Sequence, residues 1–197
     1  MALYLFGYLL PSLHVPQISS EGVESLMLLP PEKFDQNEWF IIISFILTYL
    51  LILKLPKRFP LTITLLILFF GMAYVQVTDH ILAGASYNLY DINDSGKFEW
   101  FDLIGWFIYP PFGYFFVYFL DKWSFRGLQI FLYILGWSLI AMLVEWISLK
   151  FNMFKYYHWN FFYSYPVYLL TLGIYLLFYL YITSAFKKLK SLRKPVN

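Results

Sequence analysis

The side chains best suited to chemistry in this sequence lie between residues 145 and 160. Glu145 sits inside a long apolar run, where an ionisable group must be satisfied by polar partners or be functional. Trp146 follows it directly. A dense group of polar and aromatic residues comes next: Tyr156, Tyr157, His158, Trp159 and Asn160.

Two carboxylates are predicted to lie at the same depth in a membrane. Glu145 comes 18 residues after Gly127, where its apolar run begins, and Asp79 comes 18 residues after Leu61, where another run begins. A helix rises roughly 27 Å over this distance, which nearly crosses a hydrocarbon core about 30 Å thick. His80 adjoins Asp79, and His158 lies just beyond the run that holds Glu145. We expect these groups to share one level near the outer surface.

Helical spacing places small and polar residues on one face of each run. The first stripe is Ser138, Ala141, Glu145 and Ser148. The second is Ala73, Gln76, Asp79 and Ala83. We expect both stripes to face the interior of a helical bundle, where they could face each other.

The common depth predicted for the two carboxylates and the two histidines supports three interpretations. Carboxylate and imidazole ligands suit zinc or manganese, and a buried carboxylate could serve as a general acid or base. The favoured interpretation is a structural hydrogen-bonded cluster. The residues in question are Asp79, His80, Glu145 and His158. A neighbouring group could bind a ligand or extend the cluster: Tyr157, Trp159 and Asn160. The H-E-x-x-H spacing of zinc proteases does not occur.

A loop over residues 91–102 matches the spacing of an EF-hand calcium loop. Gly96 stands at the sixth position, where such a loop turns sharply, and Asp102 ends it one methylene shorter than the usual Glu. The ligand positions hold Asp91, Asn93, Ser95, Lys97, Glu99 and Asp102. Calcium is therefore the leading cofactor prediction, ahead of zinc or manganese. A polar turn rich in Asx and Gly is the alternative.

Composition places the chain in a lipid bilayer. Of its 197 residues 60% are hydrophobic, 24% are aromatic and 13% are charged, and the mean hydropathy is +0.62. A net charge of +2 makes no case for nucleic acid. A protein partner or a homo-oligomer stays open. Because the chain has no cysteine, disulfides, thiolate nucleophiles and Cys-ligated metals are excluded.

The positioning elements are expected to be five transmembrane helices in an all-α bundle. The predicted spans are 39–55, 61–83, 101–120, 127–147 and 164–186, each near the roughly 20 residues a bilayer requires. Pro110 and Pro111 predict a kink or a break in the third span. Residues 1–38 are expected to form an outer interfacial or re-entrant segment, 39–186 the transmembrane domain and 187–197 a basic tail.

Basic residues predict the orientation of the chain. Ten of the 14 Lys and Arg residues fall in the two linkers and the tail that would share one side: Lys54, Lys57, Arg58, Lys122, Arg126, Lys187, Lys188, Lys190, Arg193 and Lys194. Most carboxylates go the opposite way. We therefore expect the N-terminus outside and the C-terminus in the cytoplasm.

One block of the sequence resembles a family of small five-span membrane proteins of Bacillota, many of them from endospore formers. The block holds Glu145, Trp146, Ile147, Tyr157, Trp159, Asn160 and Ser164. Tyr109-Pro110 and Asp79 match more weakly, and the resemblance spans about residues 40 to 186. It implies a five-span topology and a bacterial cytoplasmic or spore membrane. The activity of that family is unknown, so no mechanism follows.

Three functions agree with these observations. The first is a non-enzymatic membrane component whose outer polar cluster supports the bundle or binds an ion or a partner. The second is a membrane enzyme that acts on a lipid-linked substrate at the outer leaflet with Glu145 and Asp79. The third, a small transporter, is disfavoured because the spans contain few ionisable groups.

Overall fold

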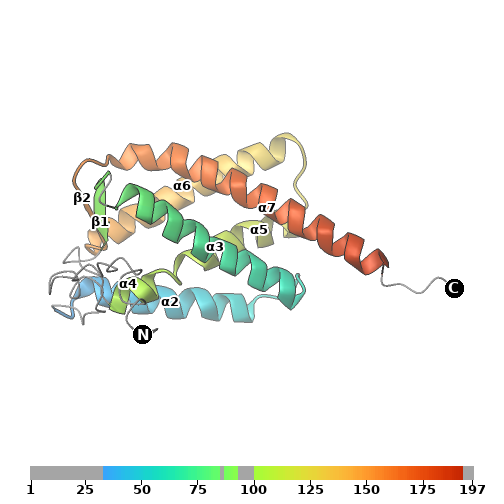
Figure 1. The fold of residues 1–197 in the computed structure, drawn as a ribbon, viewed down its shortest axis with the longest axis horizontal. Helices are drawn as coiled ribbons and strands as arrows, with labels where there is room; N and C mark the ends of the chain where they lie inside the picture. Colours follow the sequence, from blue (N-terminus) through green and yellow to red (C-terminus); the bar gives the residue numbers. More distant parts are fainter. Residues whose placement is uncertain (1–32, 85–86, 93–99, 193–197) are drawn as a thin grey trace, which may run out of the picture.

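The computed structural model describes residues 33–84, 87–92 and 100–192 (Figure 1). Five helices in it are long and apolar enough to cross a membrane, over Gln36–Lys54, Leu61–Leu82, Trp100–Trp123, Leu128–Lys150 and Phe161–Leu192. The expectation of an all-α bundle with five such helices is confirmed. The side that each terminus faces stays a prediction. Residues 1–32 of the proposed re-entrant segment lie outside the described residues.

Helices α2 (Gln36–Lys54) and α3 (Leu61–Leu82) form a hairpin, joined by the short linker 55–60. Helix α2 begins before the expected residue 39 because Asp35 and Glu38 make a capping box. The Asp35 backbone N–H donates to Glu38 Oε2 at 2.7 Å, and Asn37 N–H donates to Asp35 Oδ1 at 3.2 Å. Glu38, expected in the outer segment 1–38, therefore belongs to the first turn of the helix.

The third span is broken, as its two prolines predict. Helix α4 (Trp100–Gly105) ends before a short turn, and α5 (Tyr109–Trp123) starts with Pro110 and Pro111 in its first turn. Proline is tolerated there because the first helical N–H groups have no partner within the helix. The break leaves Tyr109 at the start of α5. Helix α5 contacts α2, α3, α6 and α7.

The core lies where α3, α5 and α7 (Ser164–Leu192) meet. Gly71 and Gly113 let the helices approach closely around the buried ring of Tyr175. A Cβ atom at Gly113 would stand 2.1 Å from Tyr175 Cε1, and one at Gly71 would stand 2.2 Å from the Tyr175 hydroxyl. Small residues at such contacts are typical of helices packed in membranes.

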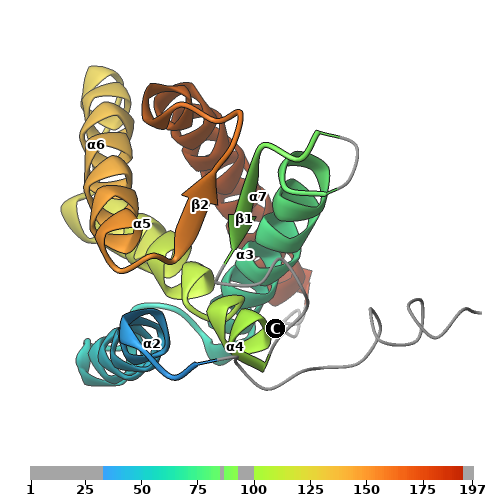
Figure 2. The ribbon, with the colours of Figure 1, turned by 90° about the vertical axis from the view of Figure 1, so that its left-hand side faces the viewer.

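A two-stranded antiparallel sheet closes one end of the bundle. Strand β1 (Tyr90–Ile92) follows α3, and β2 (Phe154–Tyr156) follows α6 (Leu128–Lys150). The register pairs Tyr90 with Tyr156, Asp91 with Lys155 and Ile92 with Phe154. Figure 2 looks at this end and shows the two strands lying between α6 and α3. We call it the sheet end. No pattern in the sequence predicts these three-residue strands.

The opposite end gathers the three basic segments, and we call it the basic end. The α2–α3 linker and the α5–α6 linker lie here beside α7, whose last turns run on beyond them (Figure 1). Arg58 pairs with Asp121 at 2.6 Å between Nη2 and Oδ2. Helix α7 runs on to Leu192, so Lys187, Lys188 and Lys190 continue the helix beyond the expected end of the span at residue 186.

Candidate functional site

The sheet holds two tyrosines in register, and each binds a carboxylate on a different helix. Tyr90 and Tyr156 stand directly opposite each other, so their side chains lie on the same face of the sheet. The Tyr90 hydroxyl donates to Asp79 Oδ1 on α3 at 2.7 Å. The Tyr156 hydroxyl donates to Glu145 Oε1 on α6. The sheet is thereby fastened to both helices.

Glu145 is also bound from the start of α7. The Ser164 hydroxyl donates to Glu145 Oε1 at 2.6 Å, and Trp159 Nε1 donates to Ser164 Oγ at 3.0 Å. Glu145 is 8% exposed and Ser164 is 3% exposed. A buried carboxylate with several donors is far better satisfied than one that relies on a single contact. This chain of bonds joins α6 to the segment that leads into α7.

Two further tyrosines complete the cluster. Tyr109, at the start of α5, lies close enough to Asp79 and Glu145 for its hydroxyl to interact electrostatically with both carboxylates. Tyr168, on α7, lies within electrostatic range of Glu145. We use the name carboxylate–tyrosine cluster for the two carboxylates and the four tyrosines: Asp79, Glu145, Tyr90, Tyr109, Tyr156 and Tyr168. Its members come from both strands and from α3, α5, α6 and α7.

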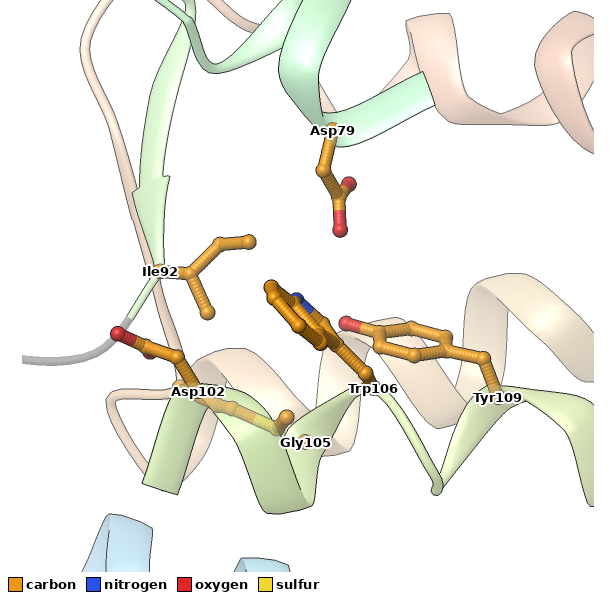
Figure 3. A pocket seen from close by; sticks show the side chains of 7 residues that line it. Asp79, Ile92, Asp102, Gly105, Trp106 and Tyr109 are labelled. Carbon is orange, nitrogen blue, oxygen red and sulfur yellow. The ribbon is translucent and has the colours of Figure 1, made fainter. Parts of the chain in front are cut away.

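A cavity of about 20 Å³ lies beside Asp79 (Figure 3). Asp79 points from α3 toward Trp106 and Tyr109, and Asp102 and Ile92 lie at the other side. This space is large enough for about one water molecule. Within the described part of the chain, Asp79 Oδ2 and Glu145 Oε2 are buried and have no hydrogen-bond partner. Asp79 therefore keeps one oxygen beside this cavity, where a water molecule can bond to it.

Burial sets the protonation of the two strand tyrosines. It raises the pKa of Tyr90 well above its ordinary value, and the nearby Asp79 carboxylate raises it further. The pKa of Tyr156 is raised by burial and then by the hydrogen bond to Glu145. Both hydroxyls therefore remain protonated donors at neutral pH.

The two histidines differ from the carboxylates in burial, because one oxygen of Asp79 and one of Glu145 are buried. The side chains of His80 and His158 are exposed, and the His158 backbone N–H donates to the Leu89 carbonyl at 3.1 Å. In residues 33–84, 87–92 and 100–192, no three His, Asp or Glu side chains are placed to hold a metal ion. Zinc or manganese at Asp79, His80, Glu145 and His158 has no geometric support among these residues.

The two predicted stripes differ in outcome. On α6, Ser138, Ala141, Glu145 and Ser148 are all buried, as expected. On α3 the buried positions are Ile63, Ile67 and Gly71. Of the predicted stripe, Ala73 is exposed, and the other three residues are half-buried: Gln76, Asp79 and Ala83. The inward face of α3 is therefore rotated from the predicted stripe. Asp79 still reaches the interior through its side chain.

The predicted aromatic group divides into separate contacts. Trp159 reaches Glu145 through Ser164. The exposed Tyr157 donates its hydroxyl to Asp91 Oδ2 at 2.7 Å, and Asn160 Oδ1 accepts from the Phe162 backbone N–H at 3.0 Å. Tyr157 and Asn160 thus hold the loop after β2.

The predicted calcium loop falls largely outside the described residues. Asn93, Ser95, Lys97 and Glu99 belong to the range 93–99, which the structure does not describe. At its two ends, Asp91 accepts the Tyr157 hydroxyl and Asp102 lines the small cavity. Calcium binding stays a prediction.

Sequence reasoning missed the tyrosines and Ser164 as partners of the carboxylates. One signal was present: Tyr90 follows Asp79 by 11 residues, and Tyr156 follows Glu145 by the same 11. Equal spacing from two carboxylates predicted to share a level indicates two similar connections at one end of the bundle.

Comparisons of this chain with family models, with curated proteins and with solved structures give no match.

Proposed function

We propose that this protein is a non-enzymatic, multi-pass component of the bacterial cell membrane whose carboxylate–tyrosine cluster locks the outer end of its helices. In this proposal the sheet end faces outside, with the N-terminus, and the C-terminus faces the cytoplasm. The observation that carries the proposal is the pair of bonds from Tyr90 to Asp79 and from Tyr156 to Glu145. Each bond spans 11 residues, and the pairing of β1 with β2 joins the two connections, which lie far apart in the sequence.

The energetics of the cluster support a locking role. A hydrogen bond to a charged group contributes about 1.5–3 kcal/mol, and a buried group that loses its partner costs at least as much. Glu145 receives two such bonds, from Tyr156 and Ser164. Because these donors sit on β2 and at the start of α7, the carboxylate couples three elements. The cluster is therefore suited to hold a fixed arrangement for a partner in the membrane.

The substitution Glu145→Gln tests the proposal. The amide keeps the shape of the side chain but weakens both bonds, so we expect a folded protein whose thermal midpoint falls and whose amides in β1 and β2 exchange hydrogen faster. Ser138→Ala is the matched control, because among the described residues its buried hydroxyl bonds only to the Ile134 carbonyl of its own helix. A Glu145→Gln variant with an unchanged midpoint and unchanged exchange contradicts the proposal. So does one that folds normally but abolishes a cellular activity.

A second candidate, ion binding or catalysis at the same carboxylates, is favoured by the unpartnered oxygens Asp79 Oδ2 and Glu145 Oε2. The cavity beside Asp79 holds about one water, so a lipid-linked substrate would require the sheet to move. Metal analysis of the purified protein, with and without chelator, separates the candidates. Bound calcium or zinc that a carboxylate variant loses would favour an ion site. A purified protein that contains no metal and whose thermal midpoint is the same with and without chelator favours the structural role of the cluster.

A further inference from the structure

A cleft of about 420 Å³ opens at the basic end, away from the carboxylate–tyrosine cluster. Its walls come from the α2–α3 linker, from α3, α5, α6 and α7, and from the α5–α6 linker. The volume lies in the range of sites that bind small organic molecules. Residues between Arg58 and Lys187 thus build one concave surface.

The mouth of the cleft is positively charged. Arg58, Arg126 and Lys187 line it, and Asp121 is the one carboxylate among its lining residues. Asp121 already pairs with Arg58 and accepts the Tyr179 hydroxyl at 2.8 Å. In the part of the chain that the structure describes, Arg126 and Lys187 form no ion pair. Two cations therefore remain for an anionic ligand.

The floor of the cleft is apolar. Ile63 and Leu120 belong to the buried core, and Ile130 and Leu176 line the wall above them. Leu180 also lines the cleft, yet it is 51% exposed on the outer surface of α7. The cleft is thus continuous with a surface that a membrane helix presents to lipid tails.

We propose that this cleft binds an anionic phospholipid of the surrounding leaflet. The phosphate lies between Arg126 and Lys187, and an acyl chain runs along Leu176 and Leu180. Basic pockets between helices at a membrane surface suit such headgroups, and the guanidinium fork matches phosphate geometry. A soluble phosphate would use the cations but not the apolar floor, so the lipid satisfies both halves of the site.

The experiment compares lipids of equal tail and different charge. The purified full-length protein is titrated in detergent with phosphatidylglycerol, with phosphatidylcholine and with inorganic phosphate, and the thermal midpoint and the lipid retained in native mass spectrometry are measured. We expect phosphatidylglycerol alone to raise the midpoint and to remain bound. If phosphatidylcholine acts equally, or if inorganic phosphate gives the same shift, the proposal is wrong.

The variant Arg126→Gln with Lys187→Gln removes two cations and leaves the Arg58–Asp121 pair intact. We expect it to lose about tenfold or more in apparent affinity for phosphatidylglycerol, because each cation near an anionic lipid contributes to binding. The control, Lys57→Gln with Lys190→Gln, makes the same charge change at the basic end outside the cleft. Equal losses in both variants would overturn the site. If the double variant does not fold, Arg126→Gln and Lys57→Gln are each titrated with phosphatidylglycerol, and equal losses of affinity in these two single variants would overturn the site.

Discussion

The strand tyrosines bind buried carboxylates without adding charge to the sheet end. A tyrosine hydroxyl is a neutral donor until about pH 10, so Tyr90 and Tyr156 can satisfy Asp79 and Glu145 while the cluster keeps only the carboxylate charges. Lysine or arginine in the same place would need its own charge to be buried or paired. Tyrosine rings also pack, as the edge-on contact between Tyr90 and Trp159 shows.

This chemistry predicts instability at alkaline pH. The folded-state pKa of Tyr90 is raised by burial and by Asp79, so above about pH 10 the unfolded chain loses this proton first. Unfolding is then favoured, and stability falls by about 1.4 kcal/mol per pH unit for each such tyrosine until the folded pKa is passed. Tyr90→Phe should therefore flatten the decline of the thermal midpoint above pH 10. Tyr87→Phe is the control, since Tyr87 is 61% exposed. Parallel curves for wild type and Tyr90→Phe would contradict the account.

At this scale the sequence indicates the carboxylates but not their partners. Glu145 and Asp79 stand out because ionisable residues are rare in apolar runs. The chain contains 18 tyrosines, and nothing local distinguishes the four in the cluster from those that only pack. For the histidines, closeness in sequence suggested a contact that helix geometry does not favour. His80 is next to Asp79 in sequence, but adjacent residues point about 100° apart on a helix and do not share a face.

The bundle is held together by close approach of α3, α5 and α7. Tyr175 is 5% exposed and packs edge-on against Phe70, with ring centroids 5.1 Å apart. Gly113 on α5 lies directly beneath its ring. Because neighbouring rings surround Tyr175, it has little freedom to give way.

Gly113→Ala should therefore be strongly destabilising. The new Cβ would stand 2.1 Å from Tyr175 Cε1, so the ring or the helix must move, and overpacking of this kind costs about 1–3 kcal/mol. Gly136→Ala on α6 is the matched control, because a Cβ there meets nothing within 4 Å. We expect the thermal midpoint of Gly113→Ala to fall below that of Gly136→Ala. Equal midpoints would show that the α5–α7 contact does not limit stability.

The end of a helix could be predicted where residues next to it in the sequence determine it. Pro110 and Pro111 indicated the break in the third span because proline lacks the N–H that an interior helical turn needs. Strands β1 and β2 could not be predicted, because three residues are too few to show alternation and the partner strand is far away in sequence. The inward face of α3 also depends on a tertiary contact, the approach of Gly71 to Pro110 and Tyr175.

At the scale of the whole molecule, hydropathy and charge position were the most informative signals. Five apolar runs predicted five helices, because each spanning segment must satisfy its backbone internally. The basic segments were expected on one side, and the structure brings Arg58, Arg126 and Lys187 to one cleft. The sheet end and the basic end therefore lie at opposite ends of the bundle (Figure 1). The side of the membrane that each end faces stays a prediction.

The absence of cysteine allows a direct test of orientation. Single substitutions His158→Cys at the sheet end and Ser191→Cys at the basic end introduce exposed thiols into a cysteine-free chain. Positive residues are retained in the cytoplasm. A membrane-impermeant maleimide should therefore label His158→Cys in intact cells and label Ser191→Cys only after permeabilisation. Because the two ends are opposite ends of one bundle, either label fixes the other. The reverse pattern would invert the topology and move the carboxylate–tyrosine cluster to the cytoplasmic leaflet.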